Sequence, residues 1–213
     1  MTETEPTIEW LGHASFRIES KGMVIYIDPW QTATDRRGDL ILITHDHHDH
    51  CSPDDVARLR SKDTIIVAPP SAAAKLPGPV RTIRPGERLA LKGIEIEATP
   101  AYNLNKFRSP GVPFHSREAG NVGYVATLDG MRIYHSGDSD VIPEMSSIHA
   151  DIALLPVSGI YVMTADEAVR AAELIKPKKV IPMHVGRGIG TLDDRDSFRQ
   201  NASVPVIILP LVK

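Results

Sequence analysis

The stretch Thr44-His45-Asp46-His47-His48-Asp49-His50 places four imidazoles and two carboxylates within a handful of residues. It follows the apolar run Leu40 to Ile43, which is typical of a buried strand, and it precedes Ser52-Pro53, which is typical of a helix start. Neutral imidazoles and ionised carboxylates bind borderline divalent metals, and this set is large enough for more than one ion. The alternative is a solvated histidine-rich loop that binds metal adventitiously. The spacing and the preceding strand favour a metal site.

Two distant residues also follow a predicted strand directly or closely, as the histidine-rich stretch does. His184 follows the apolar run Lys179 to Met183, and Asp138 follows the run Met131 to Tyr134. Each is therefore expected at the C-terminal end of a strand, where it could join the histidine-rich loop. Cys51 is the only cysteine, so a cysteine-ligated structural zinc site and an intramolecular disulfide are both excluded. We interpret it as a small buried residue, consistent with a reducing compartment.

Apolar and β-branched runs recur along the chain with turn residues between them, which predicts many strands. In the first half these are Ile8 to Leu11, Phe16 to Ile18, Met23 to Ile27, Leu40 to Ile43 and Thr64 to Ala68. In the second half they are Leu89 to Leu91, Ile94 to Ala98, Val122 to Leu128, Met131 to Tyr134, Ile152 to Leu155, Lys179 to Met183 and Val206 to Leu209. Asp129-Gly130 predicts a hairpin turn.

Two helices are predicted from their start signals. One begins after Ser52, and the other begins after Thr164, which forms a capping box with Glu167 and ends before Pro177. Many strands with few helices in mixed order predict layers in which helices cover packed sheets. Because no low-complexity linker divides the chain, we expect a single domain over residues 1–213.

The two halves share a faint internal similarity. The strand Met23 to Ile27 ends at Asp28 and is followed by an aspartate-led run from Asp39, and the strand Met131 to Tyr134 leads to Asp138 and then to a run from Asp151. This predicts duplicated strand pairs that deliver carboxylates at corresponding ends.

Composition narrows the classes of partner. The chain has 213 residues, 42% hydrophobic and 24% charged, and a formal net charge of −3, which is ordinary for a globular protein. This charge gives no electrostatic reason to expect a nucleic acid or an anionic membrane as partner. The acidic start, Met1 to Glu9, lacks the features of a secretory signal, and no apolar run is long enough to span a bilayer. A cytoplasmic protein with a small-molecule substrate is expected.

The motif His45-x-His47-x-Asp49-His50, with Asp28, Gly137-Asp138 and the late His184, resembles the metallo-β-lactamase superfamily. Trp10-Leu11-Gly12-His13-Ala14-Ser15, Ile27-Asp28-Pro29 and Pro182-Met183-His184 resemble the branch that contains the bacterial ascorbate-6-phosphate lactonase and similar hydrolases. The resemblance covers nearly the whole chain. It implies an α/β fold, a four-layer αβ/βα sandwich of two mixed sheets with helices on the outside.

The resemblance also implies a ligand set. His45 and His47 would bind the first metal, Asp49, His50 and His184 the second, and Asp138 would bridge both. Asp28 would hydrogen-bond a ligating imidazole and fix its orientation, and a turn aspartate before Pro29 is the alternative.

The sequence departs from this branch at one ligand. The branch often has a histidine just after a Pro-Ala pair, whereas Pro100-Ala101-Tyr102-Asn103 places asparagine there, and a neutral amide is a poor zinc ligand. His115 lies in the loop from Asn103 to Asn121, and we predict that it folds back to complete the first site. The alternative is a surface histidine in a flexible loop, with a weak first site.

Two further predictions concern groups around the metals. His13 could bind substrate or donate a proton, and Asp49 could orient a metal-activated hydroxide and relay its proton. A turn histidine that caps backbone groups is the alternative for His13. Lys106, Arg108 and the aromatic Phe107 and Phe114 suggest a lid that binds an anionic group, or else a solvated loop.

The predicted activity is metal-dependent hydrolysis of a lactone or ester, phosphorylated or not, or of a phosphodiester, with two divalent ions. Zinc is expected and manganese is the alternative. Two other functions stay open, because fold alone does not determine function: an iron-dependent oxidoreductase and a metal-binding protein without catalysis. The resemblance also allows a homo-oligomer.

Overall fold

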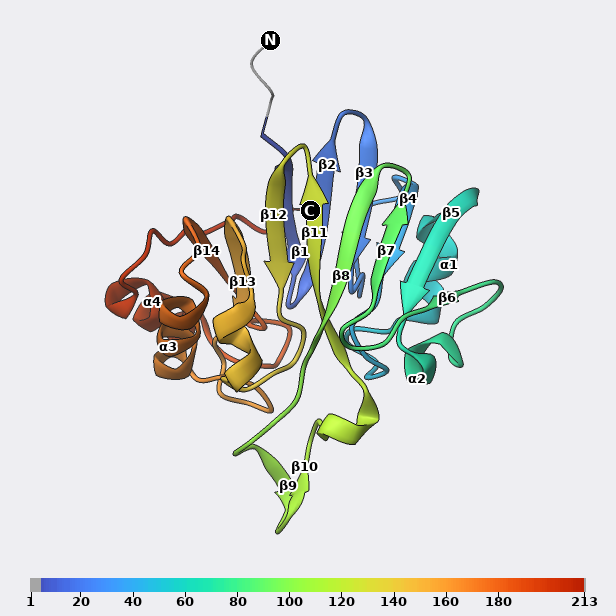
Figure 1. Ribbon diagram of the computed structural model, residues 1–213. Helices are drawn as coiled ribbons and strands as arrows, with labels where there is room; N and C mark the ends of the chain where they lie inside the picture. Colours follow the sequence, from blue (N-terminus) through green and yellow to red (C-terminus); the bar gives the residue numbers. More distant parts are fainter. Residues whose placement is uncertain (1–4, 213) are drawn as a thin grey trace.

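Two mixed sheets of six strands each lie at the centre of the computed structural model, which describes residues 5–212 (Figure 1). The first sheet has the order β1 (Thr7–Gly12), β2 (Ser15–Ser20), β3 (Met23–Ile27), β4 (Gly38–Leu42), β5 (Arg60–Ala68) and β6 (Arg81–Thr82). The second has the order β14 (Lys179–Met183), β13 (Ile152–Pro156), β12 (Met131–His135), β11 (Val122–Leu128), β8 (Ile94–Pro100) and β7 (Arg88–Leu91). A small separate pair is formed by β9 (Phe107–Ser109) and β10 (Val112–Pro113).

The helices lie outside the two sheets. Figure 1 shows α1 (Pro53–Leu59) and α2 (Pro70–Ala73) on one side and α3 (Ala165–Ile175) and α4 (Leu192–Asn201) on the other. Ser52 caps α1, and Thr164 and Glu167 form the predicted capping box of α3. Two 3-10 helices, η1 (Arg117–Ala119) and η2 (Pro143–Ser147), complete the elements.

Alternation along the strands divides the core into three layers. Ile25 and Ile27 of β3 face the apolar layer that both sheets share, whereas Val24 and Tyr26 face the layer that contains Val56 and Leu59 of α1. A third layer packs β13 against α3 and α4. This arrangement confirms the predicted α/β sandwich of two mixed sheets with external helices.

The internal similarity has a structural counterpart. β3 pairs with β4 in parallel, and β12 pairs with β13 in parallel. The backbone N–H of Val24 donates to Asp39 Oδ2 at 2.9 Å, and that of Arg132 donates to Asp151 Oδ2 at 2.8 Å. In each half, an aspartate at the start of the second strand therefore accepts a hydrogen bond from the backbone of the first strand and helps to fix the register of the pair.

Several parts of the chain differ from the predicted elements: α2, β6 and η2 were not predicted, and β5 begins at Arg60 rather than at Thr64. Val206 to Leu209 is not a strand: Val206 forms a single bridge to Val180, because Pro205 and Pro210 on either side lack the N–H groups of a ladder. The helix α4 was not predicted, although Thr191 and Asp194 form a capping box at its start. The loop from Asn103 to Asn121 contains β9, β10 and η1.

None of the described helices is long and apolar enough to cross a membrane. The prediction that Met1 to Glu9 contains no secretory signal falls partly on residues 1–4, which lie outside the described residues.

Candidate metal centre

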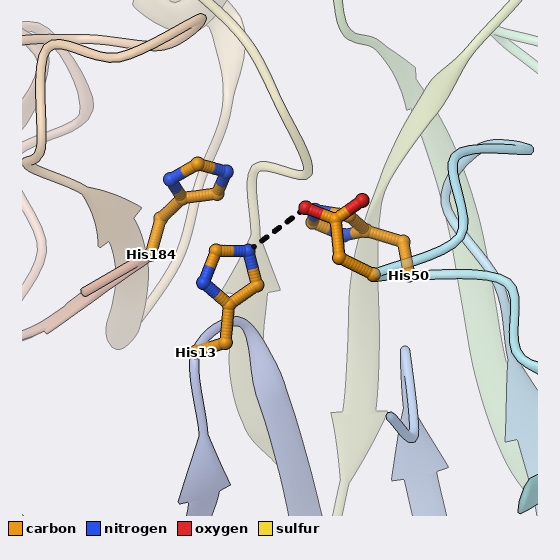
Figure 2. Close-up of side chains that lie close together, drawn as sticks. His13, His50 and His184 are labelled. Carbon is orange, nitrogen blue, oxygen red and sulfur yellow. Dashed lines mark ion pairs between the residues drawn. The ribbon is translucent and has the colours of Figure 1, made fainter. Parts of the chain in front are cut away.

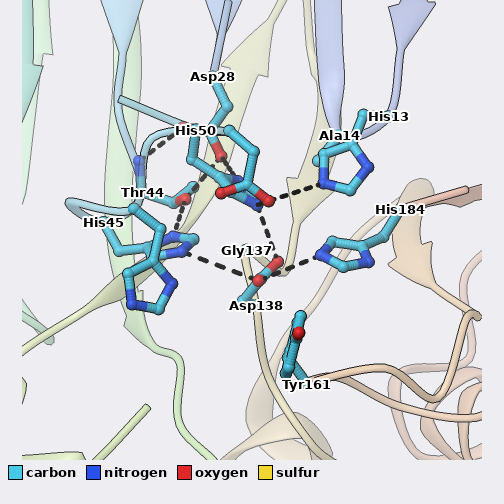
Figure 3. A network of polar contacts seen from close by, with 12 residues as sticks. His13, Ala14, Asp28, Thr44, His45, His50, Gly137, Asp138, Tyr161 and His184 are labelled. Carbon is cyan, nitrogen blue, oxygen red and sulfur yellow. Dashed lines mark hydrogen bonds and ion pairs between the residues drawn. The ribbon is translucent and has the colours of Figure 1, made fainter. Parts of the chain in front are cut away.

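The predicted metal ligands meet where strands end. The loop after β4 carries His45, His47, Asp49 and His50, Asp138 follows β12, and His184 follows β14. His13 comes from the turn between β1 and β2. Figure 3 shows the side chains of His13, His45, His50 and His184 around Asp138. They fall into two groups, within each of which the ligating atoms lie within 4.8 Å of one another.

The first group contains His45, His47, His115 and Asp138. His115 Nε2 lies 3.1 Å from His47 Nδ1 and 3.5 Å from Asp138 Oδ2, and His45 Nε2 lies 3.8 Å from the same carboxylate oxygen. Three imidazoles and one carboxylate are a suitable ligand set for a tetrahedral or five-coordinate divalent ion.

The second group contains His13, Asp49, His50 and His184 (Figure 2). Asp138 also faces this group, because His50 Nε2 lies 3.2 Å from its Oδ1 and His184 Nε2 lies 3.2 Å from its Oδ2. His13 Nε2 lies 3.2 Å from Asp49 Oδ2. Asp138 thus lies between the two groups, where a bridging ligand would be needed.

Several of these atoms are buried without a hydrogen-bond partner, which is costly unless another group binds them. They include Nε2 of His45, His50 and His184 and Oδ1 of Asp138. Burial lowers the pKa of His45, and burial likewise lowers the pKa of His115 to about 4, so both imidazoles are neutral with a lone pair free. The donor set and its unsatisfied atoms fit a pair of divalent metal ions.

Hydrogen bonds orient the imidazoles from behind. Asp28 Oδ2 accepts from His50 Nδ1 at 2.8 Å and from the Thr44 hydroxyl at 2.6 Å, so Asp28 lies beside an imidazole of the second group. Thr44 Oγ1 lies 3.0 Å from His45 Nδ1. Ser158 Oγ lies 3.0 Å from His184 Nδ1. The roles of Thr44 and Ser158 were not predicted, since a hydroxyl beside a strand end has no distinctive pattern.

His115 folds back into the site, and Asn103 holds it there. The Asn103 amide oxygen accepts from His115 Nδ1 at 2.8 Å and from the His115 backbone N–H at 2.9 Å. Its amide nitrogen donates to the Tyr161 carbonyl at 2.9 Å and to Asp140 at 3.2 Å. The asparagine therefore orients an imidazole that approaches from twelve positions later in the chain.

Other residues that the sequence singled out lie outside the two groups. Lys106 binds Glu167 at 2.7 Å and lies 3.5 Å from Asp140, so its charge is already paired. Cys51 is buried, and burial raises the pKa of its thiol to about 11, as expected for a packing residue. His135, which no pattern in the sequence singled out, is also buried, and its Nε2 donates to the Ala14 carbonyl at 2.9 Å.

A cavity of about 370 Å³ opens beside the two groups. Its lining includes His47, His48, Asp49 and Asp138 on the metal side. The candidate ligands His47, Asp49 and Asp138 are therefore reachable from outside, unlike the ligands of a closed structural metal site.

Known proteins are similar to this chain in sequence and in fold. Residues 7–184 match the family model of the beta-lactamase superfamily domain. The UPF0173 metal-dependent hydrolase of Thermoplasma acidophilum is 36% identical over 197 residues, which cover 83% of this chain and 82% of that protein. That of Methanoculleus marisnigri is 32% identical and covers 83% of this chain and 80% of that protein.

Solved structures agree with these relatives. A protein of Parabacteroides distasonis assigned as a metal-dependent hydrolase is 33% identical, with a TM-score of 0.83, and the match covers 97% of this chain and 94% of that one. Igni18, a metallo hydrolase of Ignicoccus hospitalis, is 25% identical, with a TM-score of 0.78, and the match covers 99% and 97% of the two chains. The chain therefore belongs to the metallo-β-lactamase superfamily and, within it, to the UPF0173 metal-dependent hydrolases.

Proposed function

We propose that this chain hydrolyses small-molecule esters or lactones with two divalent metal ions, zinc in the first place and manganese as the alternative. His45, His47 and His115 would hold the first ion, Asp49, His50 and His184 would hold the second, and Asp138, between the two groups, would serve both. Bound at these positions, divalent ions supply Lewis acidity and a hydroxide near neutral pH.

The position of Asp138 is the observation that carries this proposal. One buried carboxylate, 3% exposed, lies within 3.8 Å of four imidazole nitrogens from both groups. Around this carboxylate, Nε2 of His45, His50 and His184 and Oδ1 of Asp138 itself are buried with no hydrogen-bond partner in the protein. Two cations would satisfy those lone pairs and the carboxylate together.

We assign proton handling to Asp49 and His13. Burial would raise the pKa of Asp49, but the hydrogen bond with His13 and the nearby His50 lower it below its usual value, so this carboxylate is ionised at neutral pH. Asp49 also lines the cavity, and His13 lies behind it at 3.2 Å. A proton taken up at Asp49 Oδ2 can therefore pass to His13 Nε2.

The cavity and the net charge support a small-molecule substrate. The cavity volume of about 370 Å³ lies in the range of small-molecule sites. The formal net charge of −3 gives no electrostatic attraction for a nucleic acid. A lactone or carboxylic ester places a carbonyl at the metal side of this cavity.

A panel of esters, lactones and phosphodiesters tests the proposal on protein loaded with zinc or manganese. Wild type should hydrolyse an ester or lactone, and Asp138→Ala and His47→Ala should lose this activity. Asp54→Ala, which removes an exposed carboxylate on α1, is the matched control and should retain it. Normal turnover in Asp138→Ala with normal metal content would contradict the assignment. Bound iron with oxygen consumption would contradict hydrolysis itself.

A further inference from the structure

The wall of the cavity opposite the metal-binding side chains is apolar. Four of its residues are Phe114, Ile160, Tyr161 and Ile189, from the three separate loops that follow β10, β13 and β14. Figure 3 shows Tyr161 on the side of Asp138 that faces away from Asp28. We call these four residues the apolar wall.

The side chains and backbone of the apolar wall are held in place by specific contacts, although solvent reaches the wall. Phe114 and Tyr161 pack with ring centroids 4.5 Å apart, and the Tyr161 backbone has a φ of 65°, a strained conformation for an aromatic residue. Asn103 holds that conformation through its 2.9 Å hydrogen bond to the Tyr161 carbonyl. Ile160 and Tyr161 are nevertheless each 42% exposed. Adjacent exposed apolar side chains on a strained segment beside a catalytic cavity are typical of a ligand site.

No lysine or arginine lines the cavity among residues 5–212. Cations close in the sequence to its lining residues are engaged elsewhere, among them Arg117, which donates to Glu144 Oε1 at 2.8 Å. Lys106 binds Glu167 at 2.7 Å, and the Arg187 guanidinium donates to the carbonyls of Leu11 and Gln31 at 2.6 and 3.0 Å. Arg108 is exposed and lies 5.7 Å from the Phe114 ring centroid, outside the lining. A phosphate or carboxylate group on the substrate would have no charged partner on this wall.

We infer that the substrate is an uncharged ester or lactone whose acyl or alkyl part is apolar and lies against Phe114, Ile160, Tyr161 and Ile189. This inference rests on the proposed function, because it places the scissile carbonyl at the metal side. It also sets aside the phosphorylated substrate that the sequence left open.

Alkyl hydroxamates test this inference without turnover, since their head group binds metal and their tail would lie on the apolar wall. The series from acetohydroxamate to hexanohydroxamate is titrated calorimetrically into zinc-loaded protein. Each methylene should tighten binding about three- to fourfold in wild type, as expected for burial of a methylene. A hydroxamate with a phosphate at the tail end should bind more weakly than the alkyl analogue of equal length.

Variants test whether the alkyl tail of the hydroxamates lies on the apolar wall. Ile160→Ala should weaken hexanohydroxamate about fivefold and leave acetohydroxamate unchanged. Leu174→Ala is a control that removes a similarly exposed side chain on α3, 40% exposed. Arg108→Ala is a second control that removes the exposed cation. Neither substitution should change the affinity for acetohydroxamate or for hexanohydroxamate. Equal affinity along the series in wild type, or tighter binding of the phosphate-bearing ligand that Arg108→Ala abolishes, would overturn the inference. If the tail dependence holds and no ester or lactone is hydrolysed, the proposed function fails while the apolar site stands.

Discussion

Replacing Asn103 with alanine tests how the first metal site is completed. The substitution removes the acceptor of two buried donors on His115, the ring Nδ1–H at 2.8 Å and the backbone N–H at 2.9 Å. It also removes the donor to the Tyr161 carbonyl. Each buried donor left unpaired costs about 1–3 kcal/mol, so for two donors we expect a loss of about 2–6 kcal/mol in the free energy of unfolding. Loss of the group that orients a ligating imidazole should weaken the first zinc ion by about 10- to 100-fold.

Competition with a chromophoric chelator measures the zinc affinity, and urea unfolding measures the stability. Asn103→Asp keeps the acceptor for His115 but places a second carboxylate against Asp140, 3.2 Å from the present amide nitrogen. We therefore expect this variant to retain zinc affinity and to lose stability. Asn105→Ala, an exposed asparagine that bonds Glu167, is the control and should retain zinc affinity. Wild-type zinc affinity in Asn103→Ala would refute the role assigned to Asn103.

Three further predictions follow from single contacts. His13→Ala should lower kcat about 10²- to 10⁴-fold while both metals stay bound, and loss of one metal by elemental analysis would instead make His13 a ligand. Asp28→Ala removes the partner of His50 Nδ1 at 2.8 Å and should weaken the second metal about 10- to 100-fold in the chelator assay; unchanged affinity would contradict its orienting role. Burial raises the pKa of Glu167, but hydrogen bonds led by that of Lys106 outweigh it and lower the pKa to about 2. The stability from this depressed pKa is fully present above about pH 4.5 and is lost as the pH falls toward 2, so thermal melts of Glu167→Gln should show a smaller loss than wild type over that range.

The strands and the capped helices could be predicted because their signals are local. Met23–Ile27, Val122–Leu128 and Lys179–Met183 have the predicted bounds, and Thr164 forms the expected capping box. Each depends on side-chain alternation or on a side chain that bonds its own backbone neighbours. Val206 to Leu209 has the same apolar composition, but the prolines beside it prevent a ladder.

The residues that complete the site depend on chain folding over long distances. The prediction that His115 folds back rests only on the asparagine at position 103, because the local pattern around His115 does not indicate a ligand; the course of the β9–β10 segment is what brings it into the first group. Asn103 looks like a missing ligand in the sequence, and only its geometry shows that it orients His115. The apolar wall joins Phe114 to Ile160 from distant loops, so the substrate class could not be predicted from either segment alone.

The metal-to-protein ratio of wild type and of His115→Ala tests the proposed two-metal centre most directly. Each protein is reconstituted with zinc, freed of excess metal and measured by elemental analysis. Two metal ions in wild type, falling to about one in the variant, are expected if His115 holds the first ion and Asp49, His50 and His184 hold the second. One ion or none in wild type, or two in His115→Ala, would contradict the two-metal hydrolase.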